Sequence, residues 1–432
     1  MQTHLSPEFA GTRDGEQAQA ILRKCVHCGF CTATCPTYQL LGDELDGPRG
    51  RIYLIKQVLE GTAPTRKTQL HLDRCLTCRN CETTCPSGVQ YGQLVDIGRK
   101  IVEERVERPL AEKLMRGALK AGLTSPLFGP AMKLGQLVRP LLPQTLKNKV
   151  PAPSGARAQQ WPARQHPRKV LMLLGCVQPA MMPNINSATA RVLDAAGIQT
   201  LVADDAGCCG AIRTHLADTA GGLADMRRNI DAWWPLVAGL TSQGKVEAIV
   251  MNASGCGVTV KEYGHALAHD KDYADKARRI SELTRDISEL LPDIVGALKP
   301  KMRKSSGSGG GSGGGSASRP KLAFHPPCTL QHGQQLRGSV ESQLAELGFD
   351  VQLAPNESHL CCGSAGTYSV LQPELATQLR DRKLAQLQPL QADVVISANI
   401  GCIQHLQSGT ATPVRHWVEV VDEALAGLNR GD

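Results

Sequence analysis

From residue 168 onward, short apolar runs alternate with amphipathic segments, and the whole alternation occurs twice. The first copy extends from RKVLMLLGC (168–176) to VEAIVMNASGC (246–256), and the second from PKLAFHPPC (320–328) to ADVVISANIGC (392–402). Short apolar runs bounded by turn residues are typical of buried strands, and the periodic segments between them are typical of helices. Because strands that alternate with crossover helices form parallel sheets, the pattern predicts two tandem α/β repeats related by a pseudo-two-fold axis.

The residues before the repeats lack this alternation and favour helices. The stretch between Cys35 and Cys75 is long and largely helical in pattern, and amphipathic segments with several prolines follow it. Between the repeats, SSGSGGGSGGGSAS (305–318) contains no core-forming residue. We therefore expect an α+β multidomain protein with a helical domain at 1–103, connecting helices and a linker at 104–167, the first repeat at 168–300, a Gly/Ser-rich flexible linker at 301–319 and the second repeat at 320–432.

The sixteen cysteines divide evenly between the N-terminal domain and the repeats. In each repeat one cysteine follows the first strand, an adjacent pair precedes a glycine, and a last cysteine follows a later strand. These are the carboxyl ends of strands, where open α/β sheets build their sites. Two such repeats can face each other and bring together their cysteine loops, which carry Cys176, Cys208, Cys209 and Cys256 in the first repeat and Cys328, Cys361, Cys362 and Cys402 in the second.

Two segments of the N-terminal domain, CVHCGFCTATCP (25–36) and CLTCRNCETTCP (75–86), have the same cysteine spacing followed by proline. Three cysteines at steps of three residues let a short loop surround one iron–sulfur cluster, and in two-cluster ferredoxins the fourth binds the other cluster. The proline suits the start of a helix, where its missing N–H costs nothing. We predict two [4Fe–4S] clusters, one held by Cys25, Cys28, Cys31 and Cys85 and the other by Cys75, Cys78, Cys81 and Cys35.

Structural zinc sites and disulfides are the alternatives for these segments. A zinc ion is usually bound by two close pairs of ligands, whereas each segment supplies a triplet with a distant fourth cysteine. The polar N-terminus has no apolar signal-peptide core, and no stretch approaches about eighteen uninterrupted apolar residues, so we expect an intracellular protein without a membrane span. Cysteines in a reducing compartment bind metal or do redox chemistry more often than they form disulfides.

Composition narrows the function classes. A hydrophobic content of 41% with 20% charged residues describes an ordinary folded protein. Aromatic residues make up only 3% of the chain, which argues against a nucleic-acid surface built on stacking. The net charge of +8 fits an acidic partner or an anionic membrane, although a solvated basic face is the commoner interpretation.

The cysteine pairs of the repeats need more than a structural explanation. A single buried cysteine is often only a small apolar side chain. Both repeats, however, keep the same four cysteines, and neighbouring thiolates can bind different irons of one cluster. Gly210 and Gly363 follow the two pairs and remove a side chain where the backbone must approach closely. We predict at least one further iron–sulfur centre among the eight repeat cysteines.

The units GCCGA and LCCGSAG resemble the cysteine-rich CCG domains of heterodisulfide reductase, anaerobic glycerol-3-phosphate dehydrogenase and lactate-utilisation proteins. The segments CVHCGFCTATCPTYQLLGDELDGPRGRI, LAFHPPCTLQH and SHLCCGSAGTY resemble the iron–sulfur subunits of bacterial glycolate oxidases, over nearly the whole chain. One departure concerns the C-x-x-C ending of many CCG domains, because Ala253 and Asn399 stand where its first cysteine would be. Each repeat therefore has four cysteines, which disfavours a five-thiolate cluster.

The resemblance implies an electron-transfer subunit that oxidises no substrate by itself. Its partners would be an FAD-containing catalytic subunit and a second FAD-binding subunit that oxidise glycolate, or D-lactate, and its acceptor a membrane quinone. It would lie in the cytoplasm with peripheral membrane contact and bind no nucleic acid. The chain has no dinucleotide fingerprint, P-loop or nucleophile–base signature, so we expect no catalytic residue.

Several alternatives stay open. The repeats could perform thiol or disulfide chemistry as in heterodisulfide reductase, the chain could serve a lactate or glycerol-3-phosphate dehydrogenase, or the cysteines could hold zinc in a scaffold. His325 could serve as a ligand or a proton carrier, although a packed or exposed histidine is the commoner case. Arg49 and Arg51 could tune a cluster potential or bind the partner, but a solvated face is the default expectation. The basic amphipathic segment 132–149 packs on the protein or lies on a membrane.

Overall fold

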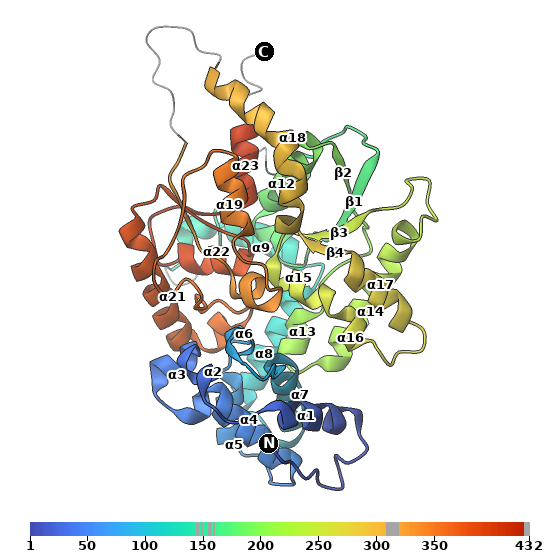
Figure 1. Cartoon of the computed structure of the whole chain (residues 1–432), viewed down its shortest axis with the longest axis vertical. Coiled ribbons are helices and arrows are strands. Elements are labelled where there is room, and N and C mark those ends of the chain that lie inside the picture. Colours follow the sequence, from blue (N-terminus) through green and yellow to red (C-terminus); the bar gives the residue numbers. More distant parts are fainter. Residues whose placement is uncertain (144–146, 148–149, 154–157, 159, 308–318, 427–432) are drawn as a thin grey trace.

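The computed structural model describes residues 1–143, 147, 150–153, 158, 160–307 and 319–426. In Figure 1 the N-terminal helices form the lower end of the molecule, and the two repeats lie side by side above them. The expected order of a helical domain, connecting helices and two α/β repeats is present. The limits of the five predicted segments stay a prediction, and most of the Gly/Ser stretch lies outside the described residues.

The N-terminal domain consists of helices that begin at residues suited to helix starts. Thr12 accepts a hydrogen bond from the Gly15 backbone at 3.2 Å, and Pro36 and Pro48 occupy first turns, where no N–H is needed. The buried faces of these helices share one apolar core. The elements are α1 (Arg13–Lys24), α2 (Phe30–Ala33), α3 (Pro36–Leu41), η1 (Glu44–Asp46), α4 (Pro48–Leu59), α5 (Arg66–Asp73), α6 (Asn80–Thr84) and α7 (Tyr91–Arg105).

The connecting segment forms the two helices expected from its amphipathic pattern. They are α8 (Leu110–Thr124) and α9 (Phe128–Leu137), followed by the short η2 (Arg139–Leu141). No residue of α8 or α9 is fully buried, although α8 contacts α13 and α9 contacts α11 of the first repeat. Part of the predicted linker after them, including residues 154–157, lies outside the described residues.

Each repeat contains a four-stranded parallel sheet, and the two sheets have the same strand order, β2-β1-β3-β4 and β6-β5-β7-β8. This confirms the predicted parallel α/β architecture. The fourth strand of each sheet was not expected, because three residues with a central arginine give no apolar run. The strands are β1 (Arg168–Met172), β2 (Ile198–Leu201), β3 (Ala248–Met251) and β4 (Thr284–Asp286), then β5 (Leu322–Phe324), β6 (Val351–Leu353), β7 (Val394–Ser397) and β8 (Val414–His416).

Helices cover the sheets. The first repeat has α11 (Gln178–Met181), α12 (Pro183–Ala195), α13 (Ala211–His215), α14 (Thr219–Val237), α15 (Ser254–Lys261), α16 (Tyr263–Ala266), α17 (Ala274–Leu283) and α18 (Ile287–Gly307). The second has the π-helical turn η4 (Thr329–Gly333), α19 (Ser339–Glu346), α20 (Tyr368–Leu371), α21 (Pro373–Leu387), η5 (Gln388–Leu390), α22 (Ile400–Gln407) and α23 (Trp417–Ala426). Helix α18 continues into the range expected to be linker.

The two repeats pack on each other reciprocally. The last helix of the first repeat, α18, contacts α19 of the second, and the last helix of the second, α23, contacts α12 of the first. Because α12 and α19 occupy equivalent places, as do α18 and α23, each repeat gives the other the same kind of contact. A single apolar core, which includes Val170 and Leu291 from one repeat and Phe324 and Trp417 from the other, extends across the boundary.

The cysteine loops of the two repeats meet at this boundary. Ser254 Oγ lies 2.7 Å from Thr329 Oγ1, and the Gly255 backbone donates to Asn399 Oδ1 at 3.4 Å. These residues belong to the segments that carry the cysteines of both repeats. The expectation that the repeats bring their cysteine loops together is therefore met by direct hydrogen bonds.

The N-terminal domain is joined to both repeats. Arg79 donates from both Nη atoms to the carboxylate of Glu262 in the first repeat. Tyr368 in the second repeat donates from its hydroxyl to the Arg74 carbonyl at 3.2 Å. Helix α3 also contacts α21, and α6 contacts η4. The helical domain is thus fixed against the ends of the repeats that carry cysteines.

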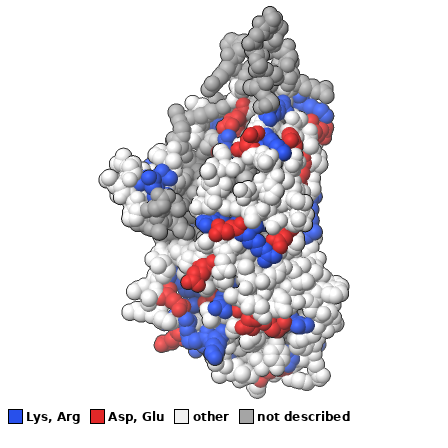
Figure 2. All heavy atoms as spheres, turned by 90° about the vertical axis from the view of Figure 1, so that its left-hand side faces the viewer, with Lys and Arg blue, Asp and Glu red and all other residues white. Residues whose placement is uncertain are grey.

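The surface shows no extended field of one charge on the face drawn in Figure 2, where basic and acidic side chains are interspersed among uncharged residues. This side of the molecule therefore shows no distinct basic face of the kind that the net charge of +8 suggested. Among the described residues, no helix has the length and hydrophobicity that a membrane crossing requires.

Candidate functional site

The two N-terminal cysteine loops have the same backbone conformation. In the first loop His27 and Gly29 have positive φ angles of 57° and 87°, and in the second Thr77 and Arg79 have 52° and 59°. These residues occupy the same places relative to the cysteines of each loop. Left-handed residues on both sides of the middle cysteine turn the chain around the sulfur atoms. Non-glycine residues adopt this conformation only at an energetic cost. The two loops therefore share a shape that regular secondary structure would not produce.

The first loop and the last cysteine of the second loop surround one cavity. Cys25, Cys28, Cys31 and Cys85 all line this cavity, and Cys81 of the second loop also reaches its wall. Burial, together with smaller effects of the neighbouring Cys25, Cys85 and Cys28, raises the pKa of the Cys31 thiol to about 11. Cys28 is exposed, whereas Cys25 is buried. The structure therefore brings together the four cysteines predicted for the first cluster.

The second loop forms a more buried group. Cys35, Cys75 and Cys81 are buried, and burial raises the pKa of Cys81 well above its ordinary value, with Cys78, Cys75 and Cys35 acting in the same direction. The Tyr91 hydroxyl donates to Cys75 Sγ at 3.6 Å. Cys35, which belongs to the first motif, thus lies among the cysteines of the second.

The donor chemistry of both groups fits iron–sulfur clusters. None of the sixteen cysteines, all of which lie in the described part of the chain, forms a disulfide. Four thiols gathered in one place would repel each other as thiolates, and bound iron offsets that charge. Thiolate sulfur is also the ligand that holds [4Fe–4S] clusters.

Arg51 lies beside the second group and is not on a solvated face, so this prediction was wrong for Arg51. Its side chain is 1% exposed, and Nε donates to the His71 carbonyl at 2.7 Å. Burial acts against its charge, but Tyr91, Cys75, Cys35 and Asp46 together raise its pKa. Helix α4 presents this residue inward, where its charge offsets that of the sulfur ligands. Arg49, by contrast, is partly exposed and is paired with Glu44 at 2.6 Å.

We expect Arg51→Met to destabilise the N-terminal domain by about 3 kcal/mol, because it leaves the buried Asp46 carboxylate with fewer cationic partners. It should also lower the reduction potential of the adjacent centre, since a nearby positive charge is lost. Thermal unfolding and a redox titration measure the two effects. Arg49→Met is the matched control, with an expected change below about 1 kcal/mol because its ion pair is at the surface. Equal effects of both substitutions would contradict the assigned role of Arg51.

The first repeat gathers its four cysteines in one group. The Cys176 and Cys209 thiols both donate to Cys208, which lowers the pKa of Cys208, and Cys209 also contacts Cys256. Two buried polar side chains hold the loop that carries the pair. Asn229 Nδ2 donates to the Cys208 carbonyl at 2.8 Å, and the Tyr263 hydroxyl donates to the Cys209 carbonyl at 2.9 Å.

The glycine after each cysteine pair is required by the backbone. Gly210 and Gly363 have φ angles of +95° and +89°. A Cβ at Gly210 would lie 2.9 Å from the Gly222 carbonyl oxygen, and one at Gly363 would lie 2.5 Å from that of Ala376. Each glycine N–H also points to the sulfur of the first cysteine of its pair, at 3.4 and 3.5 Å. The close approach predicted for these glycines is confirmed.

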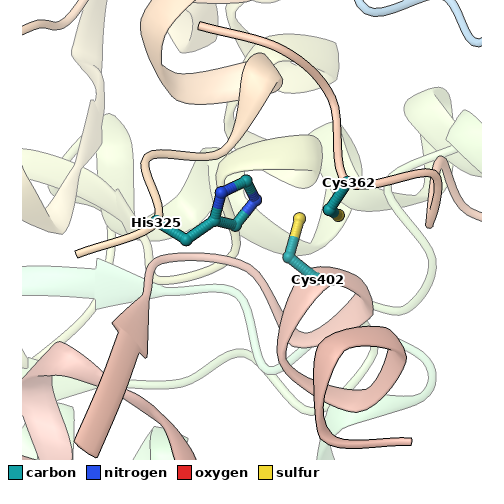
Figure 3. A group of neighbouring side chains, drawn as sticks. All are labelled: His325, Cys362 and Cys402. Atoms are coloured by element: carbon teal, nitrogen blue, oxygen red, sulfur yellow. The ribbon is translucent and has the colours of Figure 1, made fainter. Parts of the chain in front are cut away.

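The second repeat gathers its cysteines in a similar but more buried group. Cys328 Sγ lies 3.7 Å from Cys361 Sγ, and Cys362 contacts both Cys361 and Cys402. All four are buried. Figure 3 shows that His325, in the loop after β5, points its ring toward the sulfur atoms of Cys362 and Cys402.

The ammonium of Lys383 is buried near the same group. It is 2% exposed and donates to the carbonyls of Glu357 and Ser358. Burial lowers its pKa to about 8, against the effect of the nearby Cys362 and Cys361. Like Arg51, it is a buried cation beside sulfur ligands. No sequence signal marks it, because it lies in an ordinary amphipathic helix.

The second N-terminal group adjoins the second repeat directly. Cys78 packs on an apolar cluster that contains Leu76, Cys328 and Cys361. Cys328 raises the pKa of Cys78, after the larger effect of burial. The structure therefore connects the second cysteine group of the N-terminal domain to the cysteines of the second repeat.

Comparison with known proteins identifies the domains that carry these cysteines. A 4Fe-4S dicluster domain matches residues 21–89, and a Cysteine-rich domain, abbreviated CCG, matches residues 170–261 and 322–407. These matches indicate iron–sulfur clusters in the N-terminal domain, with further cysteines in the CCG region.

Whole-chain relatives give the same result. The chain is 53% identical over 426 residues to the glycolate oxidase iron-sulfur subunit of Escherichia coli (strain K12), covering 98% of this chain and 99% of that protein. It is 28% identical over 415 residues to a probable glycolate oxidase iron-sulfur subunit of Bacillus subtilis (strain 168), covering 90% and 89%. Lactate utilization protein A of the same Bacillus subtilis strain is 23% identical over 239 residues, or 55% of this chain and 90% of that protein. The chain therefore belongs to the family of glycolate oxidase iron–sulfur subunits.

Proposed function

We propose that this chain is the iron–sulfur electron-transfer subunit of a glycolate oxidase complex and passes electrons from flavoprotein subunits toward a membrane quinone. One observation carries the proposal. Of the two N-terminal cysteine groups, one includes the exposed Cys28, and the other includes Cys78, which packs against the cysteines of the second repeat. This arrangement suits a relay with an outer and an inner end.

The ligand sets follow the cysteine groups. Cys25, Cys28, Cys31 and Cys85 would hold the outer [4Fe–4S] cluster, and Cys75, Cys78, Cys81 and Cys35 the inner one. Such clusters supply one-electron redox chemistry when bound. The chain's own contribution is to bury most of the inner group away from water and to place Arg51 beside it.

The outer end is suited to a flavoprotein partner. Val26 is 69% exposed and Phe30 61% exposed, and both line the rim of the cavity that the outer cysteines share. Exposed apolar side chains around a cofactor site are typical of a surface that another protein covers. We place here the FAD-containing catalytic subunit or the second FAD-binding subunit of the complex.

Membrane contact would use a different surface, on α9 and η2. Leu134, Leu137 and Leu141, on α9 and η2, are 63%, 77% and 86% exposed, and Lys133 and Arg139 lie among them. Apolar side chains interspersed with basic ones favour an anionic membrane surface. This supports peripheral association with the cytoplasmic membrane and a quinone as the acceptor.

The similarity to lactate utilization proteins supports a small 2-hydroxy acid, glycolate or D-lactate, as the electron source.

We expect Cys28→Ser to abolish electron flow from substrate to quinone in the assembled complex, while dye reduction at the partner flavin survives. The substitution removes one ligand of the outer cluster but leaves the flavin site untouched. Both activities are measured on the same purified complex.

Thr34→Ser is the control for this experiment, because Thr34 lies in the same segment and is not a proposed ligand. It should preserve both activities. Loss of flavin-linked dye reduction in an intact Cys28→Ser complex would contradict the relay, as would unchanged electron flow to quinone.

A further inference from the structure

His325 is a buried histidine whose ring nitrogens have no protein partner. It is 1% exposed, and neither Nδ1 nor Nε2 has a hydrogen-bond partner among the described residues. One of its ring nitrogens and the sulfur atoms of Cys362 and Cys402 all lie within 4.8 Å of one another (Figure 3). Buried polar groups in folded proteins almost always have a partner, so an unpartnered ring aimed at two sulfur atoms points to a metal-binding role.

The backbone holds this ring in place. The His325 N–H donates to the Ile396 carbonyl at 2.8 Å, and Ser397 Oγ donates to the His325 carbonyl at 2.9 Å. Both contacts come from β7, the strand that leads to Cys402. The same strand therefore fixes the histidine and positions the cysteine, as a preformed ligand set requires.

The first repeat has no counterpart of this histidine. Leu173 stands three residues before Cys176, as His325 stands three residues before Cys328. Leu173 belongs to an apolar core cluster and offers no ligand atom. The cysteines of the two repeats match, so the two sites differ by one nitrogen donor.

The position of the absent C-x-x-C cysteine does not supply a further thiolate in the second repeat. Asn399 occupies it, and its Nδ2 donates to Cys402 Sγ at 3.8 Å while its Oδ1 accepts from Gly255. The asparagine thus orients Cys402 and links the repeats. The nitrogen of His325 is the donor that remains available to a metal.

We propose that His325 is an iron ligand of the second repeat, together with Cys362 and Cys402, so that this repeat holds a mixed nitrogen–sulfur centre while the first repeat offers sulfur alone. A neutral imidazole in place of a thiolate leaves less negative charge on the iron, and in other iron–sulfur centres this raises the reduction potential. The second repeat, which adjoins the inner N-terminal group, would then be the more easily reduced of the two. The inference rests on the proposed iron–sulfur centre in the CCG region.

The test is hyperfine spectroscopy of the full chain in its complex, prepared with natural and with ¹⁵N-labelled histidine. A nitrogen bonded to iron couples strongly to the unpaired electron, whereas clusters held only by cysteine show weak coupling to backbone nitrogen. We expect a strong ¹⁴N coupling in the reduced or oxidised protein that becomes a ¹⁵N coupling on labelling. His325→Cys should abolish it and shift the midpoint potential of that centre downward.

His332→Gln is the matched control, because His332 is equally buried but its ring nitrogens already contact Thr83 and the His359 carbonyl. It should leave the strong coupling unchanged. If His325→Cys does not fold, the labelled natural protein still decides the question. Absence of a strong histidine coupling, its persistence in His325→Cys, or zinc in place of iron at this site would each overturn the proposal.

Iron analysis separates this outcome from failure of the centre itself. About eight irons per chain would mean that only the N-terminal pair is present and would overturn both proposals about the second repeat. About twelve or more irons without histidine coupling would keep the centre and overturn only the role of His325. About twelve or more irons with the coupling is the result we expect.

Discussion

Cys85→Ala and Cys28→Ala are expected to remove the same cluster, although Cys85 belongs to the motif of the other loop. Cys85 lines the cavity of Cys25, Cys28 and Cys31. Each single substitution should therefore cost about four irons per chain, and the double variant should also cost about four. The measurement is iron content per folded chain, combined with the spectrum of the remaining cluster.

The cross-pairing is tested by combining Cys85→Ala with Cys78→Ala. These cysteines stand in the same sequence motif but lie in different groups, so the double variant should lose about eight irons. Cys35→Ala should behave like Cys78→Ala, since Cys35 lies among the cysteines of the second loop. Should the pair Cys85 and Cys78 cost only about four irons together, each motif would bind its own cluster and the crossed ligand sets would be wrong.

Gly363→Ala is expected to disrupt the cysteine pair of the second repeat. The left-handed φ of +89° alone disfavours alanine by roughly 1–2 kcal/mol. The new Cβ would also lie 2.5 Å from the Ala376 carbonyl oxygen and 2.9 Å from Leu379 Cβ, so helix α21 must shift. Such overpacking typically costs a further ~1–3 kcal/mol. We expect a lower unfolding midpoint and loss of iron from this repeat.

Gly366→Ala separates the two causes. Gly366 also has a positive φ, +63°, but a Cβ there meets nothing within 4 Å. It should therefore show only the conformational cost and keep the iron of the second repeat. Thermal unfolding and iron analysis of both variants give the comparison. Equal behaviour of the two would mean that the approach of α21 to the cysteine loop is unimportant.

Much of the fold followed from local patterns. The apolar runs that end near Cys176 and Cys402 became the central strands of two parallel sheets, because short runs between helical segments have few other solutions. The fourth strands, Thr284–Asp286 and Val414–His416, were missed because their three residues carry a charge in the middle and give no periodic signal. Their register with β3 and β7 depends on contacts that only the assembled sheet provides.

The candidate site was likewise predictable in part: its cysteines were, but the other residues around them were not. Cysteine spacing identified the groups, since thiolates have few other roles in such numbers. The places of Arg51, Lys383 and His325 could not be predicted, because each is decided by which distant segment packs against it. Arg51 lies in a sequence rich in glycine and charge that favoured a solvated face, yet helix α4 buries it beside Cys35 and Cys75. Local sequence reports the type of a side chain but not its neighbours.

The reciprocal packing of the repeats has a consequence for synthesis of the chain. The ribosome completes α12 and α18 before α19 and α23 exist, although these four helices share one core. Until the second repeat emerges, the apolar faces of the first have no covering partner, which is the kind of state that aggregates. The nascent first repeat thus depends on the second to close its core, so a chain truncated before α19 should be prone to aggregate.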